Sequence, residues 1–360
     1  MKSITFLMPP FQYSPVGGFK IVFEYANELS NEGYDVHIVY ADKTKYKHLP
    51  LFLYLKLYLK HILFKLKFIS RSAKIWFPLN ERITEHNVFS LDYRFVPKTD
   101  IYICTSVDTA PYLEKYPIDN NQKFYFIQDY ENWGRTDQEV RNTYHYKMNK
   151  IVISKWLLNI VTNEEAEKCT LVPNGFNLKE FYLTIPIKEK CKYSVSMLYH
   201  WADRKGCPYA FKALDIVKRN VPQLQVYLFG TPEKPMNLPD WYHYCQTPSK
   251  EEHLRINNEC AIYIAASIDE GWGLTIGEAM LCGQAVACTD NKGFREMATH
   301  NVNALLSPVK DVITLANNIQ ILINNDNLRF QLAYNGIKTM KNYSLDESYM
   351  KFKSALNLES

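Results

Sequence analysis

The chain has 360 residues, a length that suggests about two domains at ~150 residues each. Hydrophobic residues make up 47% of it and charged residues 22%, proportions that exclude a disordered or fibrous protein. The first apolar run is interrupted at Pro9-Pro10, and no uncharged apolar run approaches ~18 residues. We therefore expect neither a secretion signal nor a membrane-spanning helix.

The cysteines and the net charge narrow the class of protein further. None of the eight cysteines forms a Cys-x-x-Cys pair, which argues against a disulfide framework or a zinc ribbon and predicts a reducing, cytoplasmic location. The net charge of +4 is too small for a general nucleic-acid binder. Positive charge is nevertheless concentrated in residues 42–80, where the only acid is Asp42. The basic residues there are Lys43, Lys45, Lys47, Lys56, Lys60, Lys65, Lys67, Arg71 and Lys74.

The first part of the chain predicts a β-strand, a helix and a second strand. An apolar run at 4–8 is followed by an amphipathic helix at 19–31, a glycine at position 33 and a strand at 35–40. Further strands are predicted at 101–104, 123–127 and 150–153, the last followed by Ser154 as an N-cap for a helix through Val161.

The second half alternates strands and helices more clearly. Strands are predicted at 193–199, 224–229, 260–265, 285–289 and 303–306, and helices start near Pro208, Ser249, Leu274, Gly293 and Val309. This order predicts an α/β fold with doubly wound parallel sheets. The polar stretch 177–192 is the best linker candidate. Two Rossmann-like halves joined there are expected to bind a ligand in the cleft between the carboxyl ends of both sheets.

The most informative stretch runs from Glu270 to Glu278 as Glu-Gly-Trp-Gly-Leu-Thr-Ile-Gly-Glu. Gly271 and Gly273 allow the backbone to approach a ligand closely, and the helix that follows presents unpaired N–H groups. Glutamates accept hydrogen bonds from hydroxyl groups. The combination predicts a site for a phosphate-bearing sugar. The alternative interpretation is a glycine-rich turn with a glutamate on the helix dipole.

This stretch resembles the Glu-x7-Glu motif of retaining glycosyltransferases of family 4, which have the two-domain GT-B fold. Four further landmarks of that family follow in the family's order. They are Gly17-Gly18, Asn174-Gly175, the segment His200-Trp-Ala-Asp-Arg204-Lys205-Gly206, and the pair Cys282-Gly283 with Asn-Lys-Gly293-Phe-Arg-Glu296. Five ordered landmarks are far more specific than one glycine motif.

The resemblance implies a donor site for a nucleoside-diphosphate sugar of the UDP, dTDP or GDP type, with no separate cofactor. Lys205 would pair with the diphosphate, Glu270 would contact the transferred sugar, and Glu278 would bind the ribose hydroxyls. Arg204 and Asp129 complete the implied catalytic set. The implied donor-binding residues are Gly17, Gly18, His200, Gly230, Thr231, Gly271, Trp272, Gly273, Leu274, Thr275 and Glu278.

Two departures from the family pattern bear on mechanism. The family's clamp arginine falls on His200, so the second phosphate cation is either that histidine or Arg204, and we favour Arg204 because a guanidinium is permanently charged. Gln128 stands where the family often has histidine, and glutamine can orient a hydroxyl but cannot exchange a proton. Asp129 and Glu131 are candidates for orienting the acceptor, or are acids of a solvated loop.

The resemblance also implies a mechanism. Family members retain anomeric configuration, commonly explained by front-face displacement in which the departing diphosphate takes the acceptor proton. Catalysis is then mostly charge stabilisation of the leaving group. The sequence has no Asp-x-Asp motif, so we expect no bound metal. The Gln-Asp-Tyr-Glu loop at 128–131 loosely resembles bacterial rhamnosyltransferases of this family.

The segment 49–74 has two interpretations. At 100° per residue, its lysines and arginine fall largely within a stripe about 60° wide, while most other positions are apolar. Such a helix is suited to an anionic membrane surface, on the inner face of the membrane. It would equally suit a helix pair packed in the core with a solvated lysine face. The stripe contains Lys56, Lys60, Lys67, Arg71 and Lys74.

Together these features predict a metal-independent hexosyl- or deoxyhexosyltransferase. Its acceptor would be a hydroxyl of a glycan or lipid-linked glycan, in the synthesis of a bacterial cell-surface polysaccharide. The expected parts are an acceptor-side domain at 1–176, a linker at 177–192, a donor domain at 193–342 and a helix at 343–360 that crosses back to the first domain. Two alternatives stay open: a nucleotide-sugar 2-epimerase on the same fold, and a non-catalytic, membrane-associated partner subunit.

Overall fold

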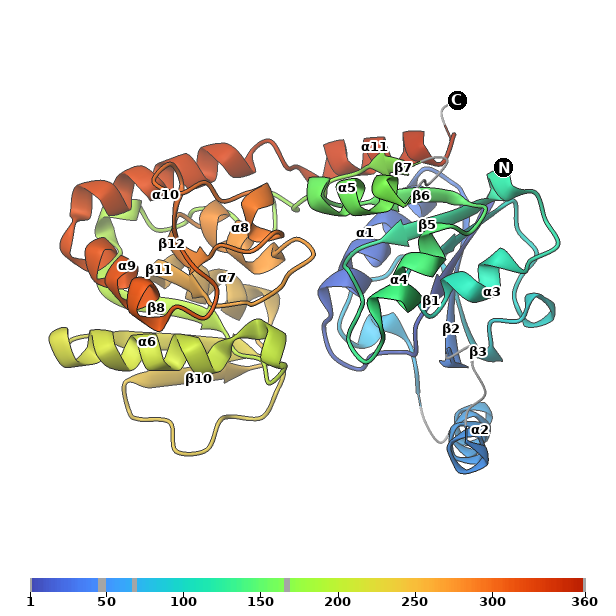
Figure 1. The fold of residues 1–360 in the computed structure, drawn as a ribbon, viewed down its shortest axis with the longest axis horizontal. Helices are drawn as coiled ribbons and strands as arrows, with labels where there is room; N and C mark the ends of the chain where they lie inside the picture. Colours follow the sequence, from blue (N-terminus) through green and yellow to red (C-terminus); the bar gives the residue numbers. More distant parts are fainter. Residues whose placement is uncertain (1, 45–49, 67–69, 165–168, 359–360) are drawn as a thin grey trace. The chain divides into compact units, whose positions relative to one another are not determined.

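A computed structural model describes residues 2–44, 50–66, 70–164 and 169–358. The chain divides into two compact units (Figure 1). Unit 1 contains residues 1–173 and 349–360, and unit 2 contains residues 174–348. The segment 177–192, expected as a linker, lies inside unit 2 because it packs there: Lys190 is buried, and its ammonium donates to the carbonyl of Cys282 at 2.7 Å.

Unit 1 is a seven-stranded parallel sheet in the order β3-β2-β1-β4-β5-β6-β7. Its strands are β1 Ser3–Met8, β2 Asp35–Lys43, β3 Thr84–Ser90, β4 Ile101–Cys104, β5 Lys123–Ile127, β6 Asn149–Val152 and β7 Cys169–Leu171. Its helices are α1 Gly17–Asn31, α2 Leu51–Lys65, α3 Ala110–Glu114, α4 Asp137–Tyr144 and α5 Lys155–Asn163.

Unit 2 is a six-stranded parallel sheet in the order β10-β9-β8-β11-β12-β13. Its strands are β8 Cys191–Leu198, β9 Gln225–Gly230, β10 Tyr242–Gln246, β11 Cys260–Ala265, β12 Ala285–Thr289 and β13 Ala304–Ser307. Its helices are α6 Cys207–Asn220, α7 Lys250–Glu259, α8 Leu274–Leu281, α9 Val312–Asn324 and α10 Asp326–Met340. Within this unit α6 packs beside α9 and α8 beside α10 (Figure 1).

The central strands form because their apolar runs are buried on both faces, as parallel sheets covered by helices require. Val195, Val226, Ile262 and Ala287 come from four different strands of unit 2, and none of them is exposed to solvent. The strand order reverses next to β1 in unit 1 and next to β8 in unit 2. Such a reversal opens a crevice at the carboxyl ends of the strands, where α/β proteins bind ligands.

The last helix, α11 (Leu345–Ala355), carries the chain from unit 2 back to unit 1. Phe352 is fully buried there: its ring centroid lies 4.4 Å from that of Tyr25, 5.4 Å from that of Phe126 and 6.3 Å from that of Phe6. Aromatic burial of this kind contributes stabilisation beyond apolar area alone. The end of the chain is therefore part of the core of unit 1.

Two predicted helices differ from those observed. Within the described residues, the α-helix of the basic segment covers Leu51–Lys65, and Arg71 is buried in an ion pair with Asp42 at 2.9 Å instead of joining a solvated stripe. Lys67 lies outside the described residues. The helix expected to start near Gly293 is a single 3-10 turn, Phe294–Glu296.

Candidate active site

The loops that follow β8 and β11 meet at the reversal of strand order in unit 2. The backbone N–H of Ile268 donates to the carbonyl of Arg204 at 2.7 Å and ties the two loops together. Gly206 has φ +62, and a Cβ atom there would lie 1.9 Å from the carbonyl oxygen of Ala266. No other residue fits this crossing, because the conformation is left-handed and the space is filled by backbone. The glycine brings Lys205 beside the loop that carries Glu270.

A third loop, which follows β12, packs against the loop that carries Glu270. A Cβ at Gly293 would lie 2.3 Å from the carbonyl oxygen of Glu270. The carbonyl of Ser267 accepts hydrogen bonds from the Thr289 hydroxyl at 2.5 Å and the Asn291 amide at 3.1 Å. These contacts hold the backbone around Glu270 from the side opposite to β8.

An ion pair lies at the centre of the three loops. The Lys205 ammonium donates to Oε1 of Glu270 at 2.6 Å, and the Ser267 hydroxyl donates to the same oxygen at 2.8 Å. A nitrogen of Arg204 lies 3.9 Å from Oε2. Burial alone would raise the pKa of the Glu270 carboxyl, but the charges of Lys205 and Arg204 outweigh it and hold that pKa below its ordinary value. The site therefore carries a permanent anion between two cations.

The first turn of α8 lies directly after this anion. Its N-cap, Gly273, has φ +99, and no side chain caps the helix. A Cβ at Gly273 would lie 2.5 Å from the ring of Phe294. Uncapped N–H groups with positive partial charge suit a phosphate. Gly271 is buried in the loop just before the helix, and Leu274 and Thr275 form its first turn.

A small cavity opens under these groups. It is lined by Met197, Leu198, Lys205, Tyr263, Ile264, Ala265, Ala266, Ser267, Glu270 and Thr275. Trp272 points elsewhere: its side chain is 3% exposed, and its ring packs against Tyr343 with centroids 5.6 Å apart. Only the backbone of Trp272 is therefore suited to ligand contact, which is the role that the resemblance implies for the backbone of Gly271 to Leu274 and which stays a prediction. Glu278 is buried one turn inside α8.

His200 is held in the neutral form. Burial and the charges of Lys205 and Arg204 lower its pKa below the ordinary value, and its Nδ1 accepts a hydrogen bond from the N–H of Ala202 at 2.9 Å. A neutral imidazole adds no charge to a phosphate site. Arg204, partly exposed at 36% of its side chain, is the better second cation.

Gly230 and Thr231, which the resemblance places among the donor-binding residues, lie beside His200. A Cβ at Gly230 would lie 2.2 Å from the carbonyl oxygen of Tyr199, so the loop at Gly230-Thr231 runs against the loop after β8. The structure thus brings together, at one edge of the unit 2 sheet, the predicted residues His200, Arg204, Lys205, Gly230, Thr231, Glu270, Gly271, Gly273, Leu274 and Thr275.

The predicted residues of unit 1 gather at the corresponding edge of its own sheet. Gly17 and Gly18 begin α1, and the Gln128 amide donates to the carbonyl of Gly18 at 3.1 Å. The other amide atom, Oε1, is buried without a hydrogen-bond partner. Asp129 follows at the end of β5 and accepts the N–H of Tyr130 at 2.8 Å. Gln128 therefore ties the start of α1 to the loop after β5, and its amide oxygen has no partner among the described residues.

Glu131 is the more unusual acid of this loop. Its Oε2 accepts the N–H of Val107, in the loop after β4, at 2.6 Å. Burial, with the nearby charges of Asp129 and Asp108, raises its pKa from 4.5 to about 8, although the Val107 hydrogen bond and Arg135 oppose the shift. A protonated carboxyl near neutral pH can donate a hydrogen bond to a substrate oxygen.

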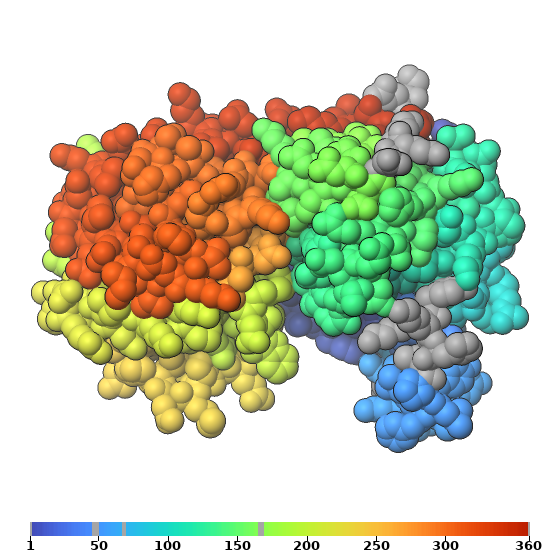
Figure 2. All heavy atoms as spheres, viewed as in Figure 1, coloured from blue at the N-terminus to red at the C-terminus, as the bar shows by residue number. Residues whose placement is uncertain are grey.

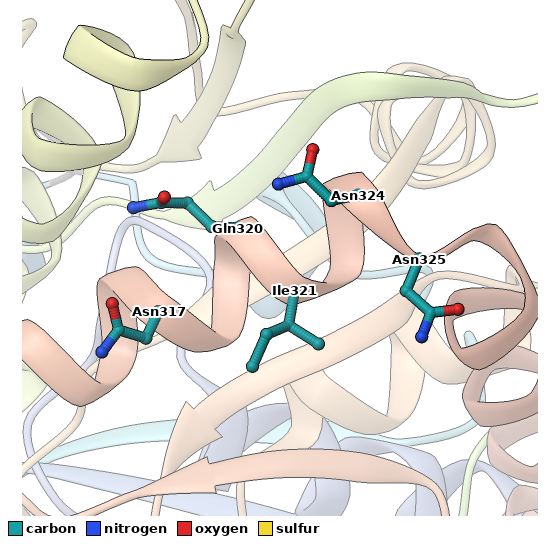
Figure 3. Close-up of a pocket in the computed structure, with 5 residues that line it drawn as sticks. All are labelled: Asn317, Gln320, Ile321, Asn324 and Asn325. Atoms are coloured by element: carbon teal, nitrogen blue, oxygen red, sulfur yellow. The ribbon is translucent and has the colours of Figure 1, made fainter.

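Sequence reasoning missed the supporting residues Ser267, Thr289 and Asn291. The only signal for them is that each is a polar residue at the end of an apolar strand or within two residues after it. One other surface feature lies away from this site: a shallow depression on α9, lined by Asn317, Gln320, Ile321, Asn324 and Asn325 (Figure 3). It brings together amides and one isoleucine but no charged group.

The loop crossing at Gly206 can be tested by substitution. Gly206→Ala should lower the free energy of unfolding by ~1–3 kcal/mol beyond the cost of the left-handed backbone, because the methyl group displaces one loop from the other. The matched control is Gly134→Ala. Gly134 has φ +74, but no described heavy atom lies within 4 Å of a Cβ added there. This substitution should therefore lower the free energy of unfolding only by the ~1–2 kcal/mol that a left-handed backbone costs. Denaturant unfolding of both variants measures the difference. Equal losses would contradict the close crossing.

The raised pKa of Glu131 predicts a pH dependence. Between its ordinary pKa of 4.5 and about 8, the folded protein holds a proton that the unfolded chain has released. The free energy of unfolding that this bound proton contributes is therefore fully present at low pH. It falls by at most ~1.4 kcal/mol per pH unit as the pH rises through this range. Glu131→Gln removes this titration. The unfolding free energy of the native protein minus that of the variant should fall between pH 5 and pH 8. Parallel pH profiles would contradict the assignment.

Comparison with known proteins identifies the fold, and a family model matches part of the chain. Residues 185–339 match the family model described as Glycosyl transferases group 1. An uncharacterised glycosyltransferase of Methanocaldococcus jannaschii is 30% identical over 102 residues, which are 28% of this chain and 29% of the relative. An N,N'-diacetylbacillosaminyl-diphospho-undecaprenol alpha-1,3-N-acetylgalactosaminyltransferase of Campylobacter jejuni is 24% identical over 106 residues, 29% of this chain and 28% of the relative. The matches thus span less than a third of these curated relatives.

Solved structures match over the full chain. A sucrose-phosphate synthase from Thermosynechococcus elongatus superposes with a TM-score of 0.73 at 16% identity, over 99% of both chains. HepE from Anabaena, in complex with UDP and glucose, superposes with a TM-score of 0.73 at 15% identity, over 100% of both chains. The chain therefore has the GT-B fold that the sequence predicts, and the donor-side loops described above lie in the region that matches Glycosyl transferases group 1.

Proposed function

We propose that this protein is a glycosyltransferase that moves a sugar from a nucleoside-diphosphate donor to a hydroxyl of a glycan or lipid-linked glycan. The observation that carries the proposal is the Lys205–Glu270 pair next to the uncapped start of α8, inside the stretch that matches Glycosyl transferases group 1. HepE, whose structure contains UDP and glucose, has the same fold.

The proposed donor site uses charges already in place. An ammonium has three N–H donors, and Lys205 directs one of them to Glu270 at 2.6 Å, so donors remain for a diphosphate oxygen. Arg204 and the N–H groups at the start of α8 add further positive potential. Glu270 accepts a sugar hydroxyl and Glu278 accepts the ribose hydroxyls. The diphosphate is thus stabilised both when bound and as a leaving group.

We assign a retaining, front-face reaction. The bond between the anomeric carbon and the diphosphate oxygen breaks, the acceptor oxygen bonds to the same face, and the acceptor proton goes to a diphosphate oxygen. Glu270 serves as a binding group and not as a nucleophile, because its carboxylate is engaged by Lys205 and Ser267. The leaving charge is balanced by Lys205, Arg204 and α8. The proposal includes no metal because the sequence has no Asp-x-Asp motif.

The acceptor side of the proposal rests on unit 1. Gln128, Asp129 and Glu131 follow β5 at the carboxyl edge of its sheet and supply donors and acceptors for a sugar hydroxyl. The relative from Campylobacter jejuni is named for a diphospho-undecaprenol acceptor, which supports a lipid-linked glycan and cell-surface polysaccharide synthesis. A rhamnosyl donor stays a hypothesis based on the loop at 128–131, and donor screens should include it.

Donor turnover distinguishes this proposal from its two alternatives. A transferase consumes the donor in proportion to added acceptor, a 2-epimerase converts the donor without acceptor, and a partner subunit does neither. The assay incubates the purified chain with nucleotide sugars, with and without a glycan acceptor, and measures nucleoside diphosphate and epimerised sugar. Release of nucleoside diphosphate that depends on acceptor supports the proposal, and either other pattern contradicts it.

Lys205 gives a prediction about turnover. Lys205→Ala removes a cation from the leaving diphosphate and should lower kcat by ~100- to 1,000-fold. Lys212→Ala, at an exposed lysine of α6, is the matched control and should turn over normally. Initial rates at saturating donor measure both, and a thermal unfolding scan checks that each variant is folded. Near-normal kcat in Lys205→Ala would remove Lys205 from the diphosphate site.

Glu278 gives a prediction about binding. Glu278→Ala removes the acceptor for the ribose hydroxyls and should weaken nucleotide affinity by ~1–3 kcal/mol, or roughly fivefold to 150-fold in Kd. Glu251→Ala, at an exposed glutamate of α7, is the control. Calorimetric titration with the nucleoside diphosphate measures each Kd. An unchanged Kd in Glu278→Ala would reject its ribose role.

A further inference from the structure

Helix α2 is apolar yet unburied. Apart from Lys56, Lys60, His61 and Lys65, every residue of this helix is apolar or aromatic, and none of its residues is buried. Figures 1 and 2 show it at the margin of unit 1, where it contacts the edge strand β3 and its neighbour β2. Large exposed apolar patches on a soluble domain indicate an interaction surface.

One face of α2 packs on its own unit. The ring of Phe89, at the end of β3, lies 5.2 Å from that of Tyr54, 5.4 Å from that of Tyr58 and 5.8 Å from that of His61, centroid to centroid. His61 Nδ1 is 2.8 Å from a carboxylate oxygen of Asp42. These contacts define the inner face and fix how the helix is rotated about its axis.

A second face, turned ~110° from the inner face about the helix axis, is an exposed apolar stripe, which we define as Leu51, Phe52, Leu55, Leu59, Leu63 and Leu66. At 100° per residue these side chains span ~120° and point away from His61. Phe52 is 78% exposed, Leu59 58% and Leu66 61%. Because the packed face is turned ~110° from the stripe, a rotation of α2 that buried the stripe on its own unit would break the contacts to Phe89 and Asp42.

Lysines flank this stripe. On the same projection Lys56 and Lys60 directly follow its Leu63 edge, whereas Lys65 lies ~40° before its Leu51 edge, between Tyr54 and Tyr58 of the inner face; all three lysines are exposed. No Asp or Glu occurs from Lys43 to Asn80. Arg71 is not part of this border, since its side chain is 3% exposed and pairs with Asp42. An apolar face flanked by lysines, without acids, complements anionic headgroups above an acyl layer.

The length of α2 decides between crossing and lying flat. Its 15 residues extend ~22 Å as a helix, less than the ~30 Å hydrocarbon core of a bilayer. Within the described residues, no helix is long and apolar enough to span a membrane. We propose that α2 lies flat on an anionic lipid bilayer, with the apolar stripe at the acyl boundary and Lys56, Lys60 and Lys65 among the headgroups. This surface adds to the proposed function, and its test needs no sugar donor.

Vesicle flotation of the full chain tests the proposal. The vesicles contain either phosphatidylcholine alone or phosphatidylcholine with phosphatidylglycerol, at low and high salt. One variant, Leu55→Ser with Leu59→Ser, removes the apolar contact. A second, Lys56→Gln with Lys60→Gln and Lys65→Gln, removes the charges. The control, Met236→Ser with Ile313→Ser, alters two residues of unit 2 that are 91% and 59% exposed. Because all the substituted side chains lie on the surface, the thermal unfolding temperature should be unchanged in all three variants.

The native chain and the control should float with anionic vesicles and much less with neutral ones. The leucine variant should lose at least tenfold in partition coefficient, and the lysine variant about fivefold per lysine removed, with a weaker salt dependence than the native chain. Flotation of both variants like the native chain would overturn the proposal. Equal binding to neutral and anionic vesicles would also overturn it. So would a chain that binds no vesicles and instead forms a dimer in sedimentation, if the leucine variant abolishes that dimer.

Discussion

The buried carboxylate of Glu270 is the constraint on which the donor-side edge of unit 2 depends. A buried charge is tolerated only when it is paired and hydrogen-bonded, and here Lys205 and Ser267 satisfy one oxygen while Arg204 lies near the other. Bringing those groups together requires backbone crossings that only Gly206 and Gly293 permit. The same pairing leaves two cations and an uncapped helix start side by side, which is the arrangement that a diphosphate needs.

How far the sequence predicts the fold depends on where each strand lies in its sheet. Ile101–Cys104, Lys123–Ile127 and Ala285–Thr289 are buried along their whole length, and their apolar runs gave the observed bounds. Strands β3, β7 and β10 were not predicted. They are edge strands, and because an edge strand is only partly covered, it needs no continuous apolar run. Helix α2 ends at Lys65, before Arg71 turns inward to Asp42, an interaction that helical periodicity cannot indicate.

The sequence predicted those residues of the candidate site that belong to local motifs. The stretch Glu270–Glu278 and the lysine at 205 lie on separate loops, and the structure joins them at 2.6 Å. The backbone role of Trp272 stays a prediction, and the packing of its side chain on Tyr343 could not be read from the motif. Thr289 and Asn291 support the site through the carbonyl of Ser267, and the shifted pKa of Glu131 depends on its burial and on neighbours from another loop. Neither the burial nor those long-range neighbours can be read from a single sequence.

A nucleotide stability screen tests the central claim most directly, namely that unit 2 carries a donor site. The purified chain is unfolded thermally in the presence of UDP, GDP, dTDP and their common sugar conjugates, including rhamnose. A nucleotide present at 100 times its Kd should add about 2.7 kcal/mol to the free energy of unfolding, and at the same nucleotide concentration the increase should be smaller by ~1–2 kcal/mol in Glu278→Ala. Stabilisation by one nucleotide type is the result that we predict. Unchanged stability with every nucleotide would contradict a donor site in this protein.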